Sequence, residues 1–420
     1  MSPERIELTA LPNGLRVVSE TVPHVQSVSV GLWVGAGSRD EAPAVRGISH
    51  FIEHMLFKGT ERRSPRDLAS AIESRGGSLN AFTDKEFTCF TARTLADDLA
   101  LAVDVLADMV RHSKLDPEEL ARERNVVIEE IKLYRDTPED LIHDLFTETL
   151  WRTHPLGRCV IGTARTIGAL DRETVAAHLA AHYTPDRMVL AAAGNVPHDD
   201  VVRLAERHFG DMEGGQRRAP RRAARESGLQ RRIRRRTEQV HFCLGGRGVN
   251  HESERRYALS VLDTALGGNM SSRLFQEIRE KRGLAYHIGT YTAAFREGGL
   301  IVVNGGTSLE TFDKVLELTR AELRKVCEEG LTEQELAEAK QQLRGGLLLG
   351  LESMSNRMMR MGRSLLALGR IPPIEDVLAR FNAVTGDDVR QVAAEAFRED
   401  RLTLAAIGPF PRETEGDTSA

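Results

Sequence analysis

The chain has 420 residues, which is enough for about two or three domains with substantial cores. Hydrophobic residues make up 41% of it and charged residues 28%, so the composition is too apolar for a disordered chain. The 57 Lys and Arg residues nearly balance the 62 Asp and Glu residues, and the formal net charge of -5 gives no electrostatic argument for a nucleic-acid partner.

The first half of the chain alternates between strand and helix patterns. The turn Pro12-Asn13-Gly14 lies between two short apolar runs and predicts a hairpin over residues 6–20. The further elements expected in this half are a strand at Val28–Val34, helices at 47–58 and 65–75, strands within Ser78–Thr94, and longer helices at 96–112 and 117–135. This order argues for an α+β domain rather than a regular βαβ repeat.

The composition changes near residue 211. Residues 211–230 contain two adjacent glycines, a proline and five arginines, which is typical of an interdomain linker, and a strand is expected near 238–245. A second arginine cluster lies between Arg231 and Arg236. Because no aromatic residues are interleaved, we interpret the arginines as a solvated linker and not as a nucleic-acid surface. The predicted domains are therefore residues 1–210 and 231–420, joined by 211–230.

Two similar segments indicate an internal duplication. Leu115–Ala121 and Leu331–Ala337 lie 216 residues apart, and each follows a long amphipathic helix. Each also opens a further helix with a capping residue, Asp116 or Thr332, and has a Glu three positions later. We therefore expect two tandem copies of an α+β domain, each with a mixed or antiparallel sheet packed against helices.

The motif His50-Phe51-Ile52-Glu53-His54 carries the strongest chemical signal. On a helix, His50 and His54 lie one turn apart on the same face, so both imidazoles can bind one metal ion. Glu53 stays near that face and could take a proton from a metal-bound water. This HxxEH pattern is the inverted form of the zincin motif. His178 and His182 have the same spacing without a neighbouring Glu, and we interpret that pair as a structural or surface feature.

Two histidines leave a zinc ion short of a third protein ligand, and a carboxylate is the usual choice. The helix that starts near Asp116 offers Glu123, Glu129 and Glu130. Glu123 and Glu130 are seven residues apart and share a face, whereas Glu129 points about 100° away. Spacing alone does not choose between Glu123 and Glu130.

Together, these features resemble the pitrilysin-like zinc peptidases with the inverted motif, in particular the β subunit of the mitochondrial processing peptidase and its bacterial homologues. The segments that carry the resemblance are Pro12–Leu15, Gly35–Glu41, His50–Thr60, Leu79–Ala81, Arg122–Glu130 and Tyr183–Asn195. The resemblance implies that His50, His54 and Glu130 bind one zinc ion per chain. It further implies that Glu53 is the general base and that Glu123 supports the site from behind the ligands.

The resemblance extends into the second half at Leu274–Tyr286, where this family places an Arg and a Tyr seven residues apart. Arg279 and Tyr286 fit, and they would hold the substrate carbonyl and help to stabilise the oxyanion. Arg282 competes with Arg279 but is only four residues from the tyrosine. The corresponding helix of this half, Leu259–Leu266, has neither His nor Glu, so only the first half would hold metal.

The family binds its substrate as an added β-strand at the position of Leu79–Thr83. Exposed backbone groups of such a strand recognise any extended peptide, and Asn80 and Ala81 are the candidate contacts. Several carboxylates near the site would favour basic peptides: Asp84, Glu86, Asp136, Glu139 and Asp140.

The sequence therefore predicts a zinc-dependent endopeptidase whose two domains form a clamshell around an extended peptide. The alternative is a non-catalytic or partner-dependent subunit of a complex, since the family includes members that have lost the motif. A complete motif in one chain favours the enzyme, and the resemblance implies a homodimer.

The expected compartment is the bacterial cytoplasm. No apolar run approaches the ~18 residues of a membrane helix, and the N-terminus lacks the charged and apolar segments of a secretory signal. The cysteines show no CxxC pair, and we expect them to be buried free thiols: Cys89, Cys159, Cys243 and Cys327.

Overall fold

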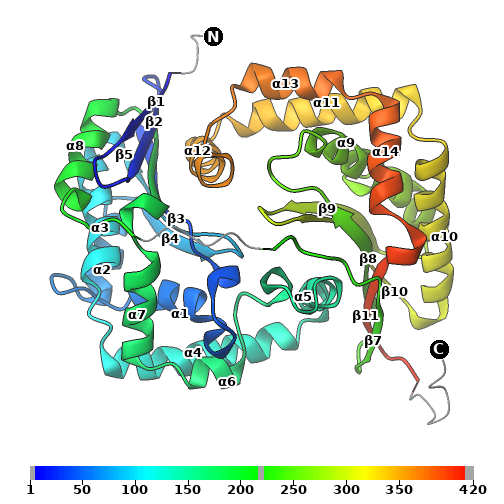
Figure 1. Ribbon diagram of the computed structural model, residues 1–420, viewed down its shortest axis with the longest axis horizontal. Helices are drawn as coiled ribbons and strands as arrows, with labels where there is room; N and C mark the ends of the chain where they lie inside the picture. The colour runs from blue at the N-terminus through cyan, green and yellow to red at the C-terminus, as the bar shows by residue number, and fades with distance from the viewer. Residues whose placement is uncertain (1–4, 216–221, 412–420) are drawn as a thin grey trace. The chain divides into compact units, whose positions relative to one another are not determined.

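The computed structural model describes residues 5–215 and 222–411, which form two compact units (Figure 1). The first unit takes in the described residues of Met1–Lys132, Arg158–Pro220 and Leu348–Pro372. The second takes in those of Leu133–Gly157, Arg221–Leu347 and Pro373–Ala420. No helix in the described ranges is long and apolar enough to cross a membrane.

The first unit is built on a six-stranded sheet with the order β1-β2-β6-β3-β5-β4. Its strands are β1 (Ile6–Ala10), β2 (Arg16–Thr21), β3 (Ser27–Val34), β4 (Ser78–Thr83), β5 (Thr88–Leu95) and β6 (Met188–Gly194). Only the β2–β6 pair is parallel, and the other neighbours are antiparallel. The predicted hairpin and the strand at Val28–Val34 are confirmed, and β4 is an edge strand.

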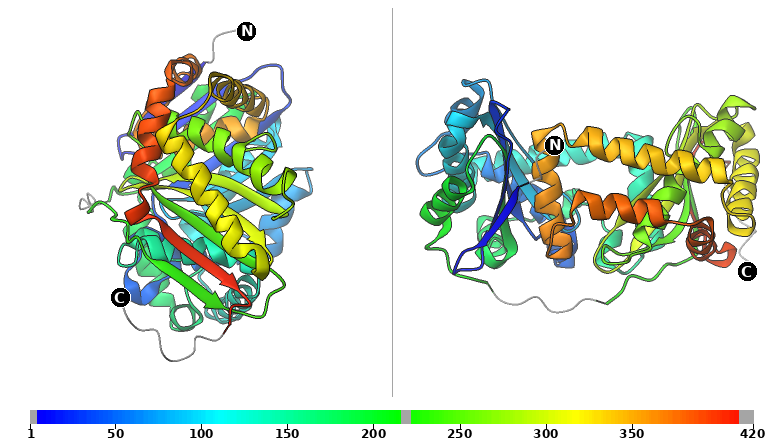
Figure 2. Two further views of the ribbon diagram at one scale, coloured as in Figure 1. Left: turned by 90° about the vertical axis from the view of Figure 1, so that its right-hand side faces the viewer. Right: turned by 90° about the horizontal axis from the view of Figure 1, so that it is seen from above.

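Helices cover both faces of this sheet (Figures 1 and 2). They are α1 (Ile48–Leu56), α2 (Pro65–Glu73), α3 (Leu99–His112), α4 (Pro117–Arg135), α6 (Ala164–Gly168), α7 (Arg172–His182), α8 (His198–Phe209) and α12 (Met354–Leu368), with short 3-10 turns at Ser38–Asp40, Pro43–Val45, Ala96–Asp98 and Pro185–Arg187. Successive strand residues point to opposite faces. In β3, Leu32 and Val34 therefore join the core with α1 and α3, whereas Trp33 packs against Met358 and Met361 of α12.

The second unit has a five-stranded sheet with the order β7-β11-β8-β10-β9. Its strands are β7 (Gln230–Arg234), β8 (Val240–Gly248), β9 (His287–Ala294), β10 (Gly299–Thr307) and β11 (Thr403–Gly408). Its helices are α5 (Pro138–Leu150), α9 (Arg256–Gly267), the π-helical η6 (Phe275–Glu280), α10 (Leu309–Glu328), α11 (Glu333–Gly350), α13 (Ile374–Ala383) and α14 (Gly386–Ala396), with 3-10 turns at Pro155–Gly157 and Glu399–Arg401. On one sheet face Phe146 and Leu150 of α5 pack against Cys243, Val302 and Ala405.

The two sheets repeat one topology, which supports the predicted duplication. In each, a parallel pair (β2–β6 or β7–β11) is followed by three antiparallel neighbours. The helices keep the spacing seen in the sequence: α4 and α11 start 216 residues apart, and so do α5 and α12. Thr332 and Glu335 form the expected capping box, whereas Glu119 pairs with Arg122 instead of returning to Asp116.

Each half of the chain supplies one helix to the sheet of the other. Helix α5 comes from the first half and covers the second sheet, and α12 comes from the second half and covers the first sheet. The compact units thus differ from the contiguous domains 1–210 and 231–420 at these two segments.

The predicted linker 211–230 differs from the structure at its end. Its residues 216–221 lie outside the described ranges, but Ala224 is buried in the second unit. The first strand of that unit also starts earlier than the expected strand near 238–245. It is β7, which contains Arg231, Arg232 and Arg234 of the second arginine cluster.

None of the four cysteines forms a disulfide bond among the described residues, but only Cys89 and Cys243 are buried as expected, while Cys159 and Cys327 are half-exposed.

Candidate metal centre

Helix α1 presents the HxxEH motif from a firmly held N-terminus. Gly47 precedes the helix with a φ of 91°, and a Cβ atom there would lie 2.6 Å from the carbonyl oxygen of Ile161. The buried carboxylate of Glu41 accepts hydrogen bonds from the backbone N–H groups of Gly47 (2.7 Å) and Ser49 (2.9 Å). These bonds satisfy donors that the first turn of a helix leaves unpaired. The apolar residues of α1 are buried, which fixes the helix, and both imidazoles on its other face contact glutamates of α4.

His50, His54 and Glu130 come together as the sequence predicts. One ligand atom from each lies within 4.8 Å of the others, and no other such group of three occurs within residues 5–215 and 222–411. The Nε2 atoms of His50 and His54 lie 3.8 and 3.6 Å from the two carboxylate oxygens of Glu130. This arrangement leaves a common space between three potential ligand atoms.

Glu123 lies behind His54 and takes no direct part in the triad. Its Oε2 atom is 3.2 Å from Nδ1 of His54, and its Oε1 atom is 2.8 Å from Nζ of Lys58. The Glu123 side chain is 6% exposed and that of Glu130 is 42% exposed. The structure thereby distinguishes the two glutamates that share a helix face. A carboxylate on Nδ1 sets the tautomer of His54 and leaves Nε2 as the ligand atom.

Burial and nearby charges shift the pKa values of the two imidazoles in opposite directions. Burial, together with the charge on His54, lowers the pKa of His50 to about 4, so its ring is neutral near pH 7. Burial also acts to lower the pKa of His54, but the carboxylates of Glu123, Glu130 and Glu53 outweigh it and raise that pKa. Two imidazoles and one carboxylate are a ligand set that fits zinc in catalytic sites. The residues present therefore fit the expected ion.

Glu53 lies on the same helix, next to the triad. Its Oε2 atom accepts a hydrogen bond of 2.6 Å from the hydroxyl of Thr83, at the end of edge strand β4. Burial raises the pKa of Glu53, and the nearby Glu130 acts in the same direction, against the opposing effects of Thr83 and His54. A carboxylate with a raised pKa is a better proton acceptor than an ordinary surface glutamate.

Asn80 and Ala81 lie on β4, the edge strand that ends at Thr83. The amide oxygen of Asn80 accepts a hydrogen bond of 2.8 Å from the backbone of Ala81, and the Asn80 residue is exposed. The edge position gives this strand one unpaired side. Contact with a peptide stays a prediction.

Arg279 and Tyr286 lie in the second unit. The Arg279 guanidinium stacks between two rings, at 4.6 Å from the centre of Phe275 and 5.1 Å from that of Tyr286. Arg282, the competing candidate, pairs with Glu277 at 2.5 Å. Arg279 is therefore the arginine that accompanies the tyrosine, and the catalytic role of both stays a prediction.

The remaining candidates behave as surface or structural groups. Glu129 pairs with Lys132 at 2.7 Å on the exposed side of α4. The rings of His178 and His182 lie 4.2 Å apart, and no third metal-binding side chain joins them among the described residues.

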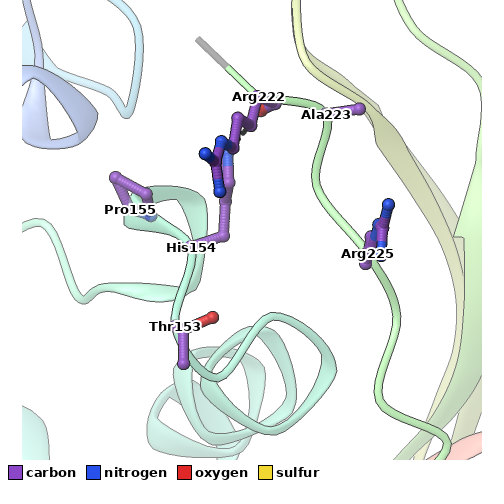
Figure 3. Close-up of a pocket in the computed structure, with 6 residues that line it drawn as sticks. All are labelled: Thr153, His154, Pro155, Arg222, Ala223 and Arg225. Atoms are coloured by element: carbon purple, nitrogen blue, oxygen red, sulfur yellow. Dashed lines mark hydrogen bonds between the residues drawn. The ribbon is translucent and has the colours of Figure 1, made fainter.

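A separate cavity in the second unit involves the arginine-rich linker (Figure 3). Its described lining residues are Thr153, His154, Pro155, Arg222, Ala223 and Arg225. Both ring nitrogens of His154 are used, since Nε2 lies 3.0 Å from the Arg222 carbonyl oxygen and Nδ1 accepts from Leu156 N–H. This cavity therefore offers no imidazole nitrogen for a metal.

Sequence reasoning missed Lys58, Thr83 and Glu41. The sequence could have indicated Lys58, because it follows His54 by four residues and a continuing helix would place both on one face. Thr83 and Glu41 reach α1 from segments without any helical spacing to it, and only the folded chain brings them there.

Two family models match the chain in succession. Residues 16–164 match the family described as insulinase (peptidase family M16), and residues 169–343 match the peptidase M16 inactive domain. The absence of HxxEH from α9 agrees with the second description.

Curated relatives and solved structures extend over almost the whole chain. An uncharacterized zinc protease of Streptomyces coelicolor is 46% identical over 96% of this chain and 90% of its own length. Another, from Bacillus subtilis, is 40% identical over 94% of this chain and 97% of its own length.

Among solved structures, a protease from Helicobacter pylori has a TM-score of 0.90 at 23% identity and covers 96% of this chain and 99% of its own. A peptidase M16 inactive domain from Pseudomonas fluorescens has a TM-score of 0.91 at 21% identity and covers 98% and 99%. These structural matches show the fold. The family models and the full-length relatives show that the chain belongs to peptidase family M16 and consists of two M16 domains.

Proposed function

We propose that the protein is a zinc-dependent endopeptidase of the processing-peptidase type that cleaves extended peptides or precursor segments. The observation that carries the proposal is the cluster of His50, His54 and Glu130 with Glu53 beside it on the same helix. A zinc ion bound there would polarise both a water molecule and the carbonyl group of the scissile bond. The names of the relatives, which call them zinc proteases, support this choice of metal and reaction.

Glu53 is the general base in this proposal. Thr83 donates a hydrogen bond to one of its carboxylate oxygens, and the other has no hydrogen-bond partner among the described residues. The free oxygen can accept a proton from the attacking water and then deliver it to the amine that leaves. The bond from Thr83 orients the carboxylate for both transfers.

The peptide is proposed to extend along β4. An edge strand pairs with any extended backbone, so Asn80 and Ala81 would align the substrate without demanding a particular sequence. Arg279 and Tyr286 would hold the carbonyl oxygen of the substrate, as the family resemblance implies. Asp84, one residue beyond β4, would favour a basic residue in the peptide, whereas Glu86 is buried and paired with Arg39. The family resemblance supports a homodimer, and we propose the bacterial cytoplasm as its compartment.

The alternative is a subunit that binds partners without catalysis. The second M16 domain matches a model that is itself described as inactive, which is the observation that favours this alternative. The first domain nevertheless retains the two histidines, the third ligand and the base. A purely structural subunit does not need them.

The test is cleavage of an unstructured, arginine-containing peptide by the purified protein. We expect cleavage that a chelator abolishes and that added zinc restores. Glu53→Gln should bind zinc as the wild type does and lose at least about a hundredfold in kcat, because the base contributes 10²–10⁴-fold in such reactions.

Glu129→Gln is the matched control, since this glutamate lies on α4 beside Glu130 but pairs only with Lys132. It should keep full activity. Substantial activity in Glu53→Gln would exclude the role given to Glu53. Stoichiometric zinc without cleavage of any peptide in a broad panel would instead favour the non-catalytic subunit.

A further inference from the structure

Lys58 lies one turn beyond His54 and contacts the candidate metal centre from behind. Backbone bonds from Phe57 N–H to His54 and from Lys58 N–H to Met55 extend the last turn of α1 to this residue. The Lys58 ammonium lies 2.8 Å from Oε1 of Glu123, while Oε2 of the same carboxylate lies 3.2 Å from Nδ1 of His54. One carboxylate thus holds both groups.

The backbone around Lys58 is held on both sides. Gly59 follows with a φ of 105°, and its carbonyl oxygen accepts a hydrogen bond from Lys114 N–H. Thr60 forms an antiparallel bridge with Ser113, beyond the end of α3. The ammonium group therefore comes from a fixed segment and not from a free loop.

We propose that Lys58 is a positioning residue of the metal centre: it fixes the Glu123 carboxylate, and Glu123 in turn fixes the His54 ring with Nε2 toward Glu130. The inference rests on the proposed function, because it concerns the same metal centre. Glu123 is almost fully buried, so its carboxylate needs donors for both oxygens. His54 supplies one and Lys58 supplies the other.

A simple charge effect predicts the opposite result from positioning. Lys58 is a cation near a site for a cation, so its charge alone disfavours metal binding, and its removal would strengthen zinc affinity. If Lys58 acts by holding Glu123, its removal frees the carboxylate and the His54 ring, and zinc affinity falls. Outer partners of this kind typically contribute 10–100-fold to metal affinity. The sign of the change therefore separates the two explanations.

The experiment measures zinc affinity of the full-length, metal-free protein by competition with a chromophoric chelator, without any peptide. We expect Lys58→Met to weaken zinc binding about tenfold and Lys58→Arg to stay within about threefold of the wild type. The matched control is Lys132→Met, which removes a lysine of an exposed ion pair with Glu129. This control should bind zinc as the wild type does.

A double-mutant cycle tests whether Lys58 acts through Glu123. In a Glu123→Gln background, Lys58→Met should have almost no further effect, since its target is gone. Thermal unfolding of the metal-free variants confirms that the comparison is made between folded proteins. Unchanged or tighter zinc binding by folded Lys58→Met, or full additivity with Glu123→Gln, would overturn the inference.

The outcomes separate this inference from the proposed function. A wild-type protein that binds zinc but cleaves no peptide contradicts the proposed function. The zinc affinities of the variants then still decide whether Lys58 is a positioning residue. A wild-type protein that binds no zinc overturns both.

Discussion

The buried side chain of Glu41 accepts hydrogen bonds from the start of α1 and has a raised pKa. Burial raises its pKa from 4.5 to about 7, although the N–H groups of Ser49 and Gly47 and the charge of Arg158 act in the opposite direction. In the unfolded chain this carboxyl has its ordinary pKa. Between these two values the folded state therefore holds a proton that the unfolded state has released.

This difference makes stability depend on pH with a definite sign. The folded state binds more protons between pH 4.5 and 7, so the free energy of unfolding contributed by Glu41 is fully present at low pH and is lost as the pH rises through about 7. We expect the stability of the wild type relative to Glu41→Gln to fall by about 2 kcal/mol from pH 5 to pH 8. Urea unfolding of both proteins at the two pH values measures it, and a rise or a constant difference would contradict the assignment.

At the scale of residues, the spacing of the motif predicts the two histidine ligands of the metal centre and their shared helix face. The spacing of His50 and His54 requires a shared helix face, and the structure has it. Spacing could not separate Glu123 from Glu130, because seven residues return to the same face. The choice depends on how α4 lies against α1, which decides that Glu130 reaches both Nε2 atoms and Glu123 reaches Nδ1.

At the scale of elements, α1 depends on a glycine at its start. Gly47 has a left-handed backbone, and a Cβ atom there would lie 2.6 Å from the carbonyl oxygen of Ile161 and 2.8 Å from Cα of Gly162, so neither its φ nor its surroundings accept a side chain. His50 follows three residues later. A shift at the start of the helix is therefore passed directly to a metal ligand.

Gly47→Ala should destabilise the protein by roughly 1–3 kcal/mol, the cost of a strained backbone, and should weaken zinc binding. Gly345→Ala is the control, because this glycine lies inside α11 with nothing within 4 Å of a Cβ atom. That change should stabilise the protein by about 0.5–1 kcal/mol. Denaturant unfolding measures both, and equal effects of the two substitutions would show that the position of the glycine is unimportant.

The elements that the sequence predicts well are those with an apolar face. The hairpin, α2 and α4 are found within a few residues of their predicted bounds, because each has one buried side and clear capping or turn residues. Strand β7 was missed for the opposite reason. It is an arginine-rich edge strand in which only Ile233 is even half-buried, so it has no alternation of apolar and polar residues.

At the scale of the whole molecule, the exchanged helices make each sheet dependent on both halves of the chain. Trp33 and Val189 of the first sheet pack with Met358 and Leu365 of α12. A contiguous first domain lacks α12. The sequence could not predict this exchange, because periodicity shows that a helix has an apolar face and not which sheet that face covers.

Residues 1–215 expressed alone should therefore expose an apolar sheet face and aggregate or bind a hydrophobic dye. Coexpression with residues 222–420 should restore a soluble complex, because that fragment supplies α12 and receives α5. Size-exclusion chromatography of the fragments and of the mixture makes the comparison. A monomeric and cooperatively folding 1–215 fragment would contradict this dependence.

The exchange also couples positions that are distant in the gene. A Cβ atom at Gly362 in α12 would collide with the Trp33 ring, and one at Gly31 in β3 would collide with the Met358 side chain. A substitution in one half can therefore be accepted only together with a compensating change in the other. Duplicated halves usually gain the freedom to diverge, but here the paired surfaces oblige both halves to be inherited together. Recombination that replaced one half with that of a distant relative would bring a mismatched helix to each sheet.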